Sequence, residues 1–178
     1  MKKTIFFMSL CLFFCLTASA QKVQTKTFAD RLMLEMGFDA TTKQHDVSPF
    51  GVSVNAGYRF TPRLYAYARF QGTIGLYENG DIRTYAKTQN VGGGIGYVVH
   101  KETRQSRTDL WSLRAQMTGS IGNADWKNTT YDIGLYWQSK SQCGKVAPTV
   151  GIGFRHTNSH TCGWADHNGI FVSVAFGF

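Results

Sequence analysis

Beyond its first twenty residues, this 178-residue sequence contains no run of 18 consecutive apolar residues. A helix that spans a bilayer needs about 20 mostly apolar residues, so the remainder of the chain offers no candidate for one. The 3.6-residue apolar periodicity of helices is also missing, as are low-complexity tracts and any sign of a second domain. The roughly 158 residues that follow the first twenty are the length of one domain.

The sequence also lacks the short motifs of several enzyme and binding classes. It has no Walker loop, dinucleotide fingerprint or zincin motif, and no paired glycosidase carboxylates in a convincing context. The run Gly92-Gly93-Gly94 belongs to an alternating segment and is interpreted as strand rather than as a phosphate cradle. No helix-turn-helix or zinc pattern accompanies the basic net charge, so we expect no nucleic-acid partner, and we expect no cofactor.

The first twenty residues predict a secretory signal peptide. Two lysines precede the apolar run Ile5–Leu16, and Ala18-Ser19-Ala20 supplies a small-residue cleavage site. The mature domain is therefore expected to span residues 21–178. Cleavage removes two lysines and lowers the formal net charge from +8 to +6. Outer-membrane lipid and the phosphates of lipopolysaccharide are the expected partners of this charge.

Eight segments of the mature sequence alternate apolar side chains with polar or small ones, which indicates β-strands with two unlike faces. Their length is close to the roughly 9–11 residues of a tilted membrane-crossing strand. The fold class predicted is therefore all-β, an eight-stranded antiparallel up-and-down transmembrane β-barrel with its apolar face toward lipid. The segments are Leu32–Phe38, Phe50–Phe60, Leu64–Leu76, Val91–Val99, Trp111–Ile121, Tyr131–Trp137, Val146–Phe154 and Ile170–Phe178.

Parity alone does not say which face points inward, so a soluble lipocalin-like barrel with an apolar interior is the alternative. Aromatic residues on the apolar face favour the membrane barrel, because they fall at strand ends, where a lipid interface would lie. Phe60, Tyr97, Trp111, Trp137 and Phe178 are expected at the periplasmic ends, and Phe38, Phe50 and Tyr131 near the outer ends.

The same alternation places the connections. Periplasmic turns are expected at Thr61–Arg63, His100–Thr108 and Gln138–Lys145, and outer loops at Asp39–Pro49, Tyr77–Thr84, Asn123–Asp125 and Thr157–His167. Cys143 and Cys162, the two cysteines left after cleavage, then lie at opposite ends of one strand, roughly 25 Å apart. A disulfide needs Cα atoms within about 7 Å, so we expect none within the chain.

The chain resembles small bacterial outer-membrane β-barrels of the OmpX/OmpA-like transmembrane type, a resemblance carried by the signal peptide, the eight strands, the aromatic rims and the final Phe178. It implies localisation as an integral monomer in the bacterial outer membrane. It also implies that the last strand is read by the barrel-assembly machinery, through Val172, Val174, Phe176 and Phe178. The alternative for these four residues is a lipid-facing role alone. The Ala-Ser-Ala-Gln junction is similar to that of Bacteroidetes secreted proteins.

The polar face of the strands carries charged residues of both signs, which must pair or find water inside a barrel this narrow. One hypothesis is a plug of Arg–carboxylate pairs among Arg31, Glu35, Arg69, Arg114 and Asp132. The alternative, which the sequence alone favours, is a solvated polar interior with no role beyond packing. Under both hypotheses we expect no open diffusion pore, because side chains fill an eight-stranded barrel.

The segment between the last two strands is the richest in reactive side chains. Its location is similar to the catalytic segment of PagL-like lipid A deacylases, which implies His156, Ser159 and Asp166 as base, nucleophile and orienting residue. The match fails at the nucleophile, because the residue two after His156 is Asn158. A metal site is the second hypothesis, with His156, His160, Cys162 and His167 as weak candidates in no standard zinc spacing.

The function favoured by the sequence is therefore that of a non-enzymatic integral outer-membrane protein. Its role is expected to be structural, adhesive or envelope-related, through the outer loops Asp39–Pro49 and Thr157–His167. A lipid A-modifying esterase is the alternative. The extracellular ligand cannot be named, because loops carry specificity that a fold does not specify.

Overall fold

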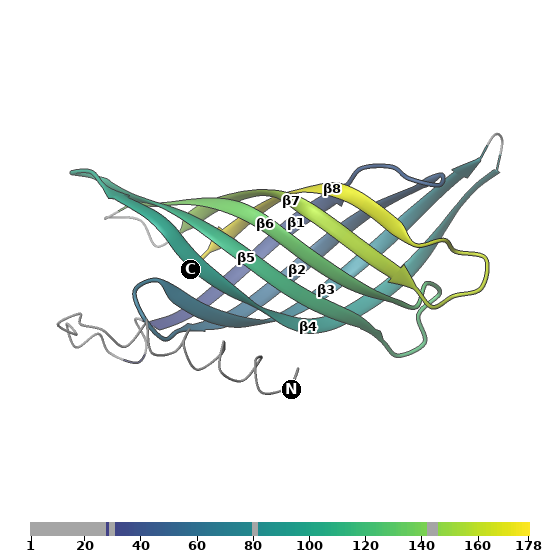
Figure 1. Ribbon diagram of the computed structural model, residues 1–178, viewed down its shortest axis with the longest axis horizontal. Coiled ribbons are helices and arrows are strands. Elements are labelled where there is room, and N and C mark those ends of the chain that lie inside the picture. Colours follow the sequence, from purple (N-terminus) through teal and green to yellow (C-terminus); the bar gives the residue numbers. More distant parts are fainter. Residues whose placement is uncertain (1–27, 29–30, 80–81, 142–145) are drawn as a thin grey trace, which may run out of the picture. The chain divides into compact units, whose positions relative to one another are not determined.

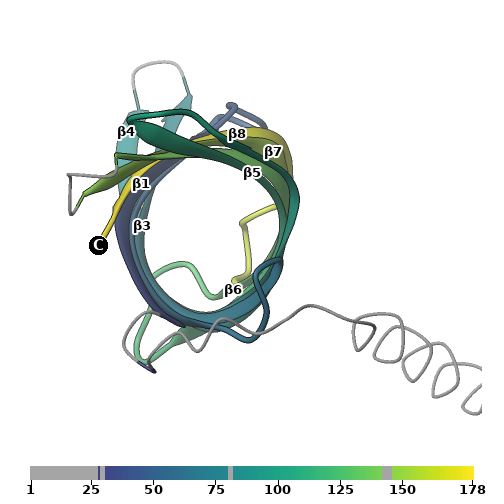
Figure 2. The same ribbon diagram turned by 90° about the vertical axis from the view of Figure 1, so that its left-hand side faces the viewer.

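The computed structural model describes residue 28 and residues 31–79, 82–141 and 146–178. From Arg31 to Phe178 the chain forms a closed antiparallel barrel in which every strand pairs with its sequence neighbours and β1 pairs with β8 (Figures 1 and 2). The predicted eight-stranded fold is confirmed, whereas the predicted signal peptide lies outside the described residues. The strands are β1 Leu32–Thr41, β2 Val47–Arg59, β3 Leu64–Asn79, β4 Ile82–Thr103, β5 Arg107–Ile121, β6 Asn128–Ser141, β7 Ala147–Ser159 and β8 His167–Gly177.

The two ends of the barrel differ in what they contain, and we name them accordingly. The terminal rim holds the start of β1, the end of β8, and the β2–β3, β4–β5 and β6–β7 ends (left in Figure 1). The loop rim holds the connections 42–46, 122–127 and 160–166 and the far end of the β3–β4 hairpin. The β1–β8 seam is the shortest pairing, with seven register pairs from Glu35↔Gly177 to Thr41↔Phe171.

The apolar face of the strands points out of the barrel. In β8, Ile170, Val172 and Val174 are exposed, whereas Phe171 and Ser173 between them are buried. The same alternation runs through the other strands, so the exterior is a band of exposed aliphatic and aromatic side chains. A soluble lipocalin-like barrel would bury this face, so that alternative is wrong. Such an exterior fits hydrocarbon, in which closed backbone pairing also leaves no strand edge unsatisfied.

The strands reach further toward the loop rim than the sequence predicted. The loop expected at Asp39–Pro49 was wrong at both ends, because β1 continues to Thr41 and β2 begins at Val47. A tight turn at His45 and Asp46, both at positive φ (47° and 62°), makes this short connection possible. At these strand ends the two faces no longer differ in hydropathy, although backbone pairing continues. The alternation of the sequence therefore predicted strand ends that fall short of the observed ones.

The other long connections also shorten, for the same reason. The loop expected at Thr157–His167 reduces to residues 160–166, and β3 and β4 pair as far as Asn79↔Ile82. The turn expected at His100–Thr108 is mostly hairpin, since β4 and β5 pair as far as Thr103↔Thr108. Among the described residues, no helix is both long and apolar enough to cross a membrane.

Candidate functional site

The barrel interior is filled in layers, beginning with apolar side chains near the terminal rim. This basal cluster consists of Met33, Tyr65, Tyr67, Val98 and Leu110, all buried. Glycines on neighbouring strands make room for the rings: Tyr65 pairs with Gly96, where an added Cβ would collide with the ring. Tyr136 has the same relation to Gly151 on β7. Gly96 and Gly151 are therefore explained by the size of the rings they face.

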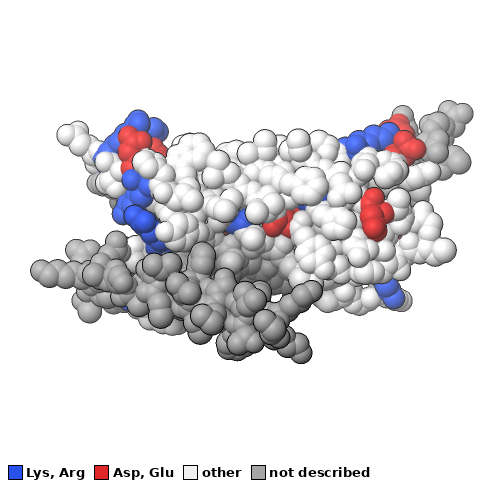
Figure 3. All heavy atoms as spheres, in the orientation of Figure 1, with Lys and Arg blue, Asp and Glu red and all other residues white. Residues whose placement is uncertain are grey.

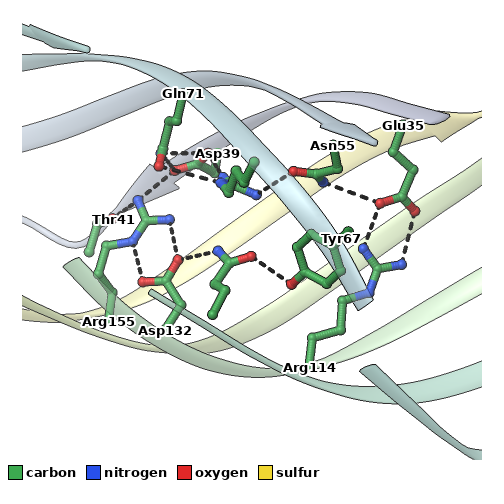
Figure 4. Close-up of polar contacts among 11 residues, drawn as sticks. Glu35, Asp39, Thr41, Asn55, Tyr67, Gln71, Arg114, Asp132 and Arg155 are labelled. Carbon is green, nitrogen blue, oxygen red and sulfur yellow. Dashed lines mark hydrogen bonds and ion pairs between the residues drawn. The ribbon is translucent and has the colours of Figure 1, made fainter. Parts of the chain in front are cut away.

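Above the basal cluster lies a buried ion pair between Glu35 of β1 and Arg114 of β5, on opposite sides of the barrel, which we call the inner pair (Figure 4). Both guanidinium Nη atoms donate to the carboxylate, Nη1 to Oε2 at 2.6 Å and Nη2 to Oε1 at 2.9 Å. Asn55 and Thr149 donate to the same carboxylate at 3.3 and 3.2 Å. Such bidentate, charge-assisted bonding is what a buried pair needs to offset its desolvation.

Aromatic rings complete the surroundings of Arg114. Its guanidinium carbon lies 4.3 Å from the centre of the Tyr136 ring, and 5.6 and 5.9 Å from the rings of Tyr65 and Tyr67. Faces of aromatic rings attract cations, and the planar guanidinium stacks on them well. The inner pair is therefore enclosed by rings on one side and by its carboxylate on the other.

Nearer the loop rim lies a second set of buried charges, Asp39, Arg69, Asp132 and Arg155, which we call the shared network (Figure 4). Arg155 of β7 forms a two-point contact with Asp132 of β6, with Nε–Oδ1 and Nη2–Oδ2 both at 2.8 Å. Its Nη1 also donates to Asp39 of β1 at 2.5 Å, and Arg69 of β3 donates to the other Asp39 oxygen at 2.9 Å. Each member thus has more than one polar partner.

Amide and hydroxyl groups join the two sets. Asn55, which donates to Glu35, accepts a long contact from Arg69 at 3.5 Å. The Tyr67 hydroxyl donates to Gln116 at 2.8 Å, and Gln116 donates to Asp132 at 2.5 Å. The interior therefore holds three arginines and three carboxylates in one connected, charge-balanced system (Figure 4).

Polar residues and then an aromatic cap close the lumen above the shared network. The polar layer leaves a cavity beside Arg155 with room for about one water molecule. The cap consists of Trp126, Trp164, Tyr77, Val47 and Ala86. Trp126 is 1% exposed, stacks on Trp164 with ring centres 5.1 Å apart, and donates its indole N–H to Ser159 Oγ at 3.2 Å. The layers together leave no wide passage through the described part of the lumen.

The structure brings together four of the five residues proposed for the plug. Glu35 and Arg114 form the inner pair, and Arg69 and Asp132 belong to the shared network, linked through Arg155 and Asp39 rather than to each other. Arg31 lies at the terminal rim, outside both sets.

Two members of the shared network were missing from the sequence-based set. The sequence pattern predicts a loop at Asp39, although this residue shares the parity of Glu35 and one more step of the alternation places it on the polar face. Arg155 lay on the polar face but was not included among the pairs. The alternation of the sequence could therefore have placed both residues on the lumen face. It could not have shown which residues they contact across the barrel.

The three residues of the esterase hypothesis each have other partners. His156 Nδ1 contacts Asn168 Oδ1 at 2.7 Å, and its ring stacks on Tyr131. The Ser159 hydroxyl accepts from Trp126, while the Asp166 carboxylate accepts the backbone amide of Ser159 at 2.8 Å. In an acyl-transfer triad, the base would contact the nucleophile hydroxyl and the carboxylate the base. The contacts seen here instead fix the β7–β8 connection.

The four candidate metal ligands do not form a cluster, and the rings of His160 and His167 contact other residues instead. His160 Nε2 contacts Thr129 Oγ1 at 3.0 Å, and His167, buried, contacts the Thr42 carbonyl at 2.9 Å. No three His, Cys, Asp or Glu side chains in the described ranges come together as metal ligands. Cys162 is exposed with a free thiol, and Cys143 lies outside the described residues.

The four residues of the assembly hypothesis all face outward from β8. Val172, Val174, Phe176 and Phe178 are exposed in the apolar band. The aromatic residues expected at the terminal rim lie there too: Phe60, Tyr97, Trp111 and Phe178 are exposed, and Trp137 is half-buried opposite Trp111.

Comparisons with known proteins add little to this geometry. No protein-family model and no curated protein matches the chain. Among solved structures, the chain is similar to the outer membrane protein Ail of Yersinia pestis, determined in a phospholipid bilayer nanodisc. The identity is 14%, the match covers 83% of this chain and 99% of that chain, and the TM-score is 0.40. A similarity this distant transfers no function.

Proposed function

We propose that the chain is a non-enzymatic integral outer-membrane protein of the OmpX/OmpA-like type, monomeric and with a sealed lumen. The observation that carries this proposal is the pairing of an apolar exterior with a charge-balanced polar interior. Water-soluble barrels have the reverse arrangement, and a lipid-embedded barrel needs this one. The predicted signal peptide and its Bacteroidetes-like junction support export to the outer membrane.

In this proposal the terminal rim faces the periplasm and the loop rim faces outward. Val172, Val174, Phe176 and Phe178 would then present the last strand to the assembly machinery while facing lipid. The outward-facing surface would consist of the β3–β4 hairpin and the connections 42–46, 122–127 and 160–166. A structural, adhesive or envelope-related role would depend on these segments.

Gel migration of membrane-extracted protein tests the membrane assignment. A folded membrane barrel resists detergent until it is boiled, so the unheated band should migrate differently from the boiled band. The protein should also stay in the membrane pellet after alkaline carbonate extraction. A soluble product whose migration does not change on heating would contradict the proposal.

Conductance across a planar bilayer tests the sealed lumen. We expect no steady channel current from the wild-type protein, because the basal cluster, the charged layers and the aromatic cap fill the interior. The Glu35→Ala/Arg114→Ala variant serves as the comparison, since it removes the inner pair without leaving an unpaired charge. A steady wild-type conductance would contradict the sealed lumen but not the membrane assignment.

A further inference from the structure

The positive charge of the barrel is unevenly divided between its two rims. Among the side chains that the structure describes, the terminal rim carries seven Lys and Arg against two acids, and the loop rim three against four. Figure 3 shows charged side chains of both signs at the two ends of the barrel and a mostly uncharged surface between them. The interior is balanced, so the excess lies at the terminal rim. The terminal-rim cations are Arg31, Arg59, Arg63, Lys101, Arg104, Arg107 and Lys140, and its acids are Glu102 and Asp109.

Among the described residues, five of the seven terminal-rim cations have no acidic partner. Only Arg104 with Glu102, at 3.0 Å, and Arg107 with Asp109, at 3.3 Å, form ion pairs. The other five have none within 4.0 Å among the described residues, which leaves a set of like charges that repel one another. A bound anion would relieve that repulsion.

The acidic side chains at the loop rim accept hydrogen bonds from backbone amides, which holds the connections between strands in place. Asp125 accepts the backbone amide of Lys87 at 3.2 Å, and Asp166 accepts that of Ser159. Lys43 and Asp46 pair at 3.6 Å. The loop rim therefore has few cations left for an external anion.

Three of the five unpaired cations lie close in sequence to aromatic residues that mark the lipid interface. Arg59 directly precedes the exposed Phe60, Arg63 follows three residues later, and Lys140 follows Trp137 by three. Lipid-facing aromatic rings sit at the level of the headgroups, so these cations lie at the same depth or just beyond it.

Resting on the proposed function, we infer that the terminal rim binds the headgroups of anionic phospholipids in the inner leaflet. At this depth the available anion is the phosphodiester of a headgroup that carries no amine. Unpaired Lys and Arg attract such a headgroup more strongly than a zwitterionic one, whose amine cancels the phosphate charge. The net positive charge of the chain would then serve phospholipid on the periplasmic side rather than lipopolysaccharide on the outer side.

Tryptophan quenching by brominated lipid tests this site. Trp126 and Trp164 belong to the cap, so the Trp126→Phe/Trp164→Phe protein reports only from Trp111 and Trp137, on the outside near the terminal rim. The protein is folded into vesicles of phosphatidylcholine and phosphatidylglycerol, with one or the other lipid brominated. Both leaflets contain both lipids, so the direction of insertion does not matter.

At low salt we expect a preference of about threefold or more for phosphatidylglycerol, falling as salt screens the charges. The variant Arg59→Gln/Arg63→Gln/Lys101→Gln/Lys140→Gln should lower this ratio to near one. The matched loop-rim control, Lys43→Gln/Lys87→Gln/Lys127→Gln, should keep it. If the double tryptophan variant does not fold, the single variant Trp164→Phe is used instead, because Trp126, the remaining cap tryptophan, is buried.

Equal quenching by the two lipids would overturn the inference, as would a preference that survives the terminal-rim variant or disappears in the loop-rim control. Quenching by neither lipid, in a protein whose migration does not change on heating, would instead contradict the membrane assignment. The two failures are thus distinguishable.

Discussion

The inner pair and the shared network bury charge in the same lumen, but they differ in how many partners each charge has. Arg114 has one carboxylate, Glu35, and its Nε has no hydrogen-bond partner among the described residues. Arg155 has two carboxylates, Asp39 and Asp132. The difference matters because a buried ion that loses its only counter-ion is far more costly than one that keeps a second.

The inner pair is therefore expected to be the more fragile of the two arrangements. Its aromatic surroundings exclude water, which strengthens the ion pair while it is intact and worsens the cost of breaking it. The shared network spreads its charge over four strands, so one substitution leaves the others partly compensated.

Glu35→Ala should lower the free energy of unfolding by about 3–5 kcal/mol, because it leaves Arg114 buried and without a counter-ion. Urea unfolding of the barrel in lipid vesicles measures this change. The control is Glu35→Met/Arg114→Met, which replaces both charges with apolar side chains and should recover most of the loss. Equal stability of Glu35→Ala and wild type would show that the pair is solvated.

Asp132→Ala should cost roughly half as much, about 2 kcal/mol, since Arg155 keeps its contact with Asp39. The same unfolding measurement applies. Combining it with Asp39→Ala should cost more than the two single changes together, because Arg155 then loses both carboxylates. A loss from Asp132→Ala as large as that from Glu35→Ala would remove the contrast between the two sets.

Gly96→Ala should lower stability by about 1–3 kcal/mol, because its methyl group would collide with the Tyr65 ring beside Arg114. Adding Tyr65→Leu should return part of this loss by freeing the space. Thermal melting followed by gel migration gives both values. If Gly96→Ala alone is neutral, the ring moves freely and does not enclose the inner pair.

Trp126→Phe should cost about 1 kcal/mol, since the hydrogen bond to Ser159 is lost while most of the packing remains. The cap lies beyond the shared network, so this change should add to Glu35→Ala within about 0.5 kcal/mol. Strong non-additivity in the double variant would mean that the cap and the inner pair form one unit.

Alternation in the sequence was sufficient to predict the barrel, because period two reports the two faces of every strand whatever its partner. It also placed Glu35, Arg69, Arg114 and Asp132 on the lumen face. It gave the wrong ends at the loop rim, where Asp39 continues the inward parity beyond Phe38 but is followed by the small Ala40 and then by two threonines, so the apolar contrast between the faces is lost. Backbone pairing, which hydropathy does not report, determines these ends.

The pairs themselves could not be predicted from alternation. Glu35 and Arg114 are 79 residues apart and meet across the lumen, so their contact depends on the stagger of four intervening strand pairings. The rings of Tyr65, Tyr67 and Tyr136 were on the correct face, but their enclosure of Arg114 depends on glycines of neighbouring strands. Both features follow from register, and register is a property of the closed sheet.

The short seam between β1 and β8 has a consequence for the order of events during folding. Both carboxylates of β1, Glu35 and Asp39, are neutralised by arginines of β3, β5 and β7, strands that come later in the chain and reach β1 only when the sheet curls round. An open sheet would hold these two acids without counter-ions at the depth of the lipid tails. Ring closure is therefore expected to bring charge neutralisation with it, which would disfavour half-closed sheets and make the last step of assembly cooperative.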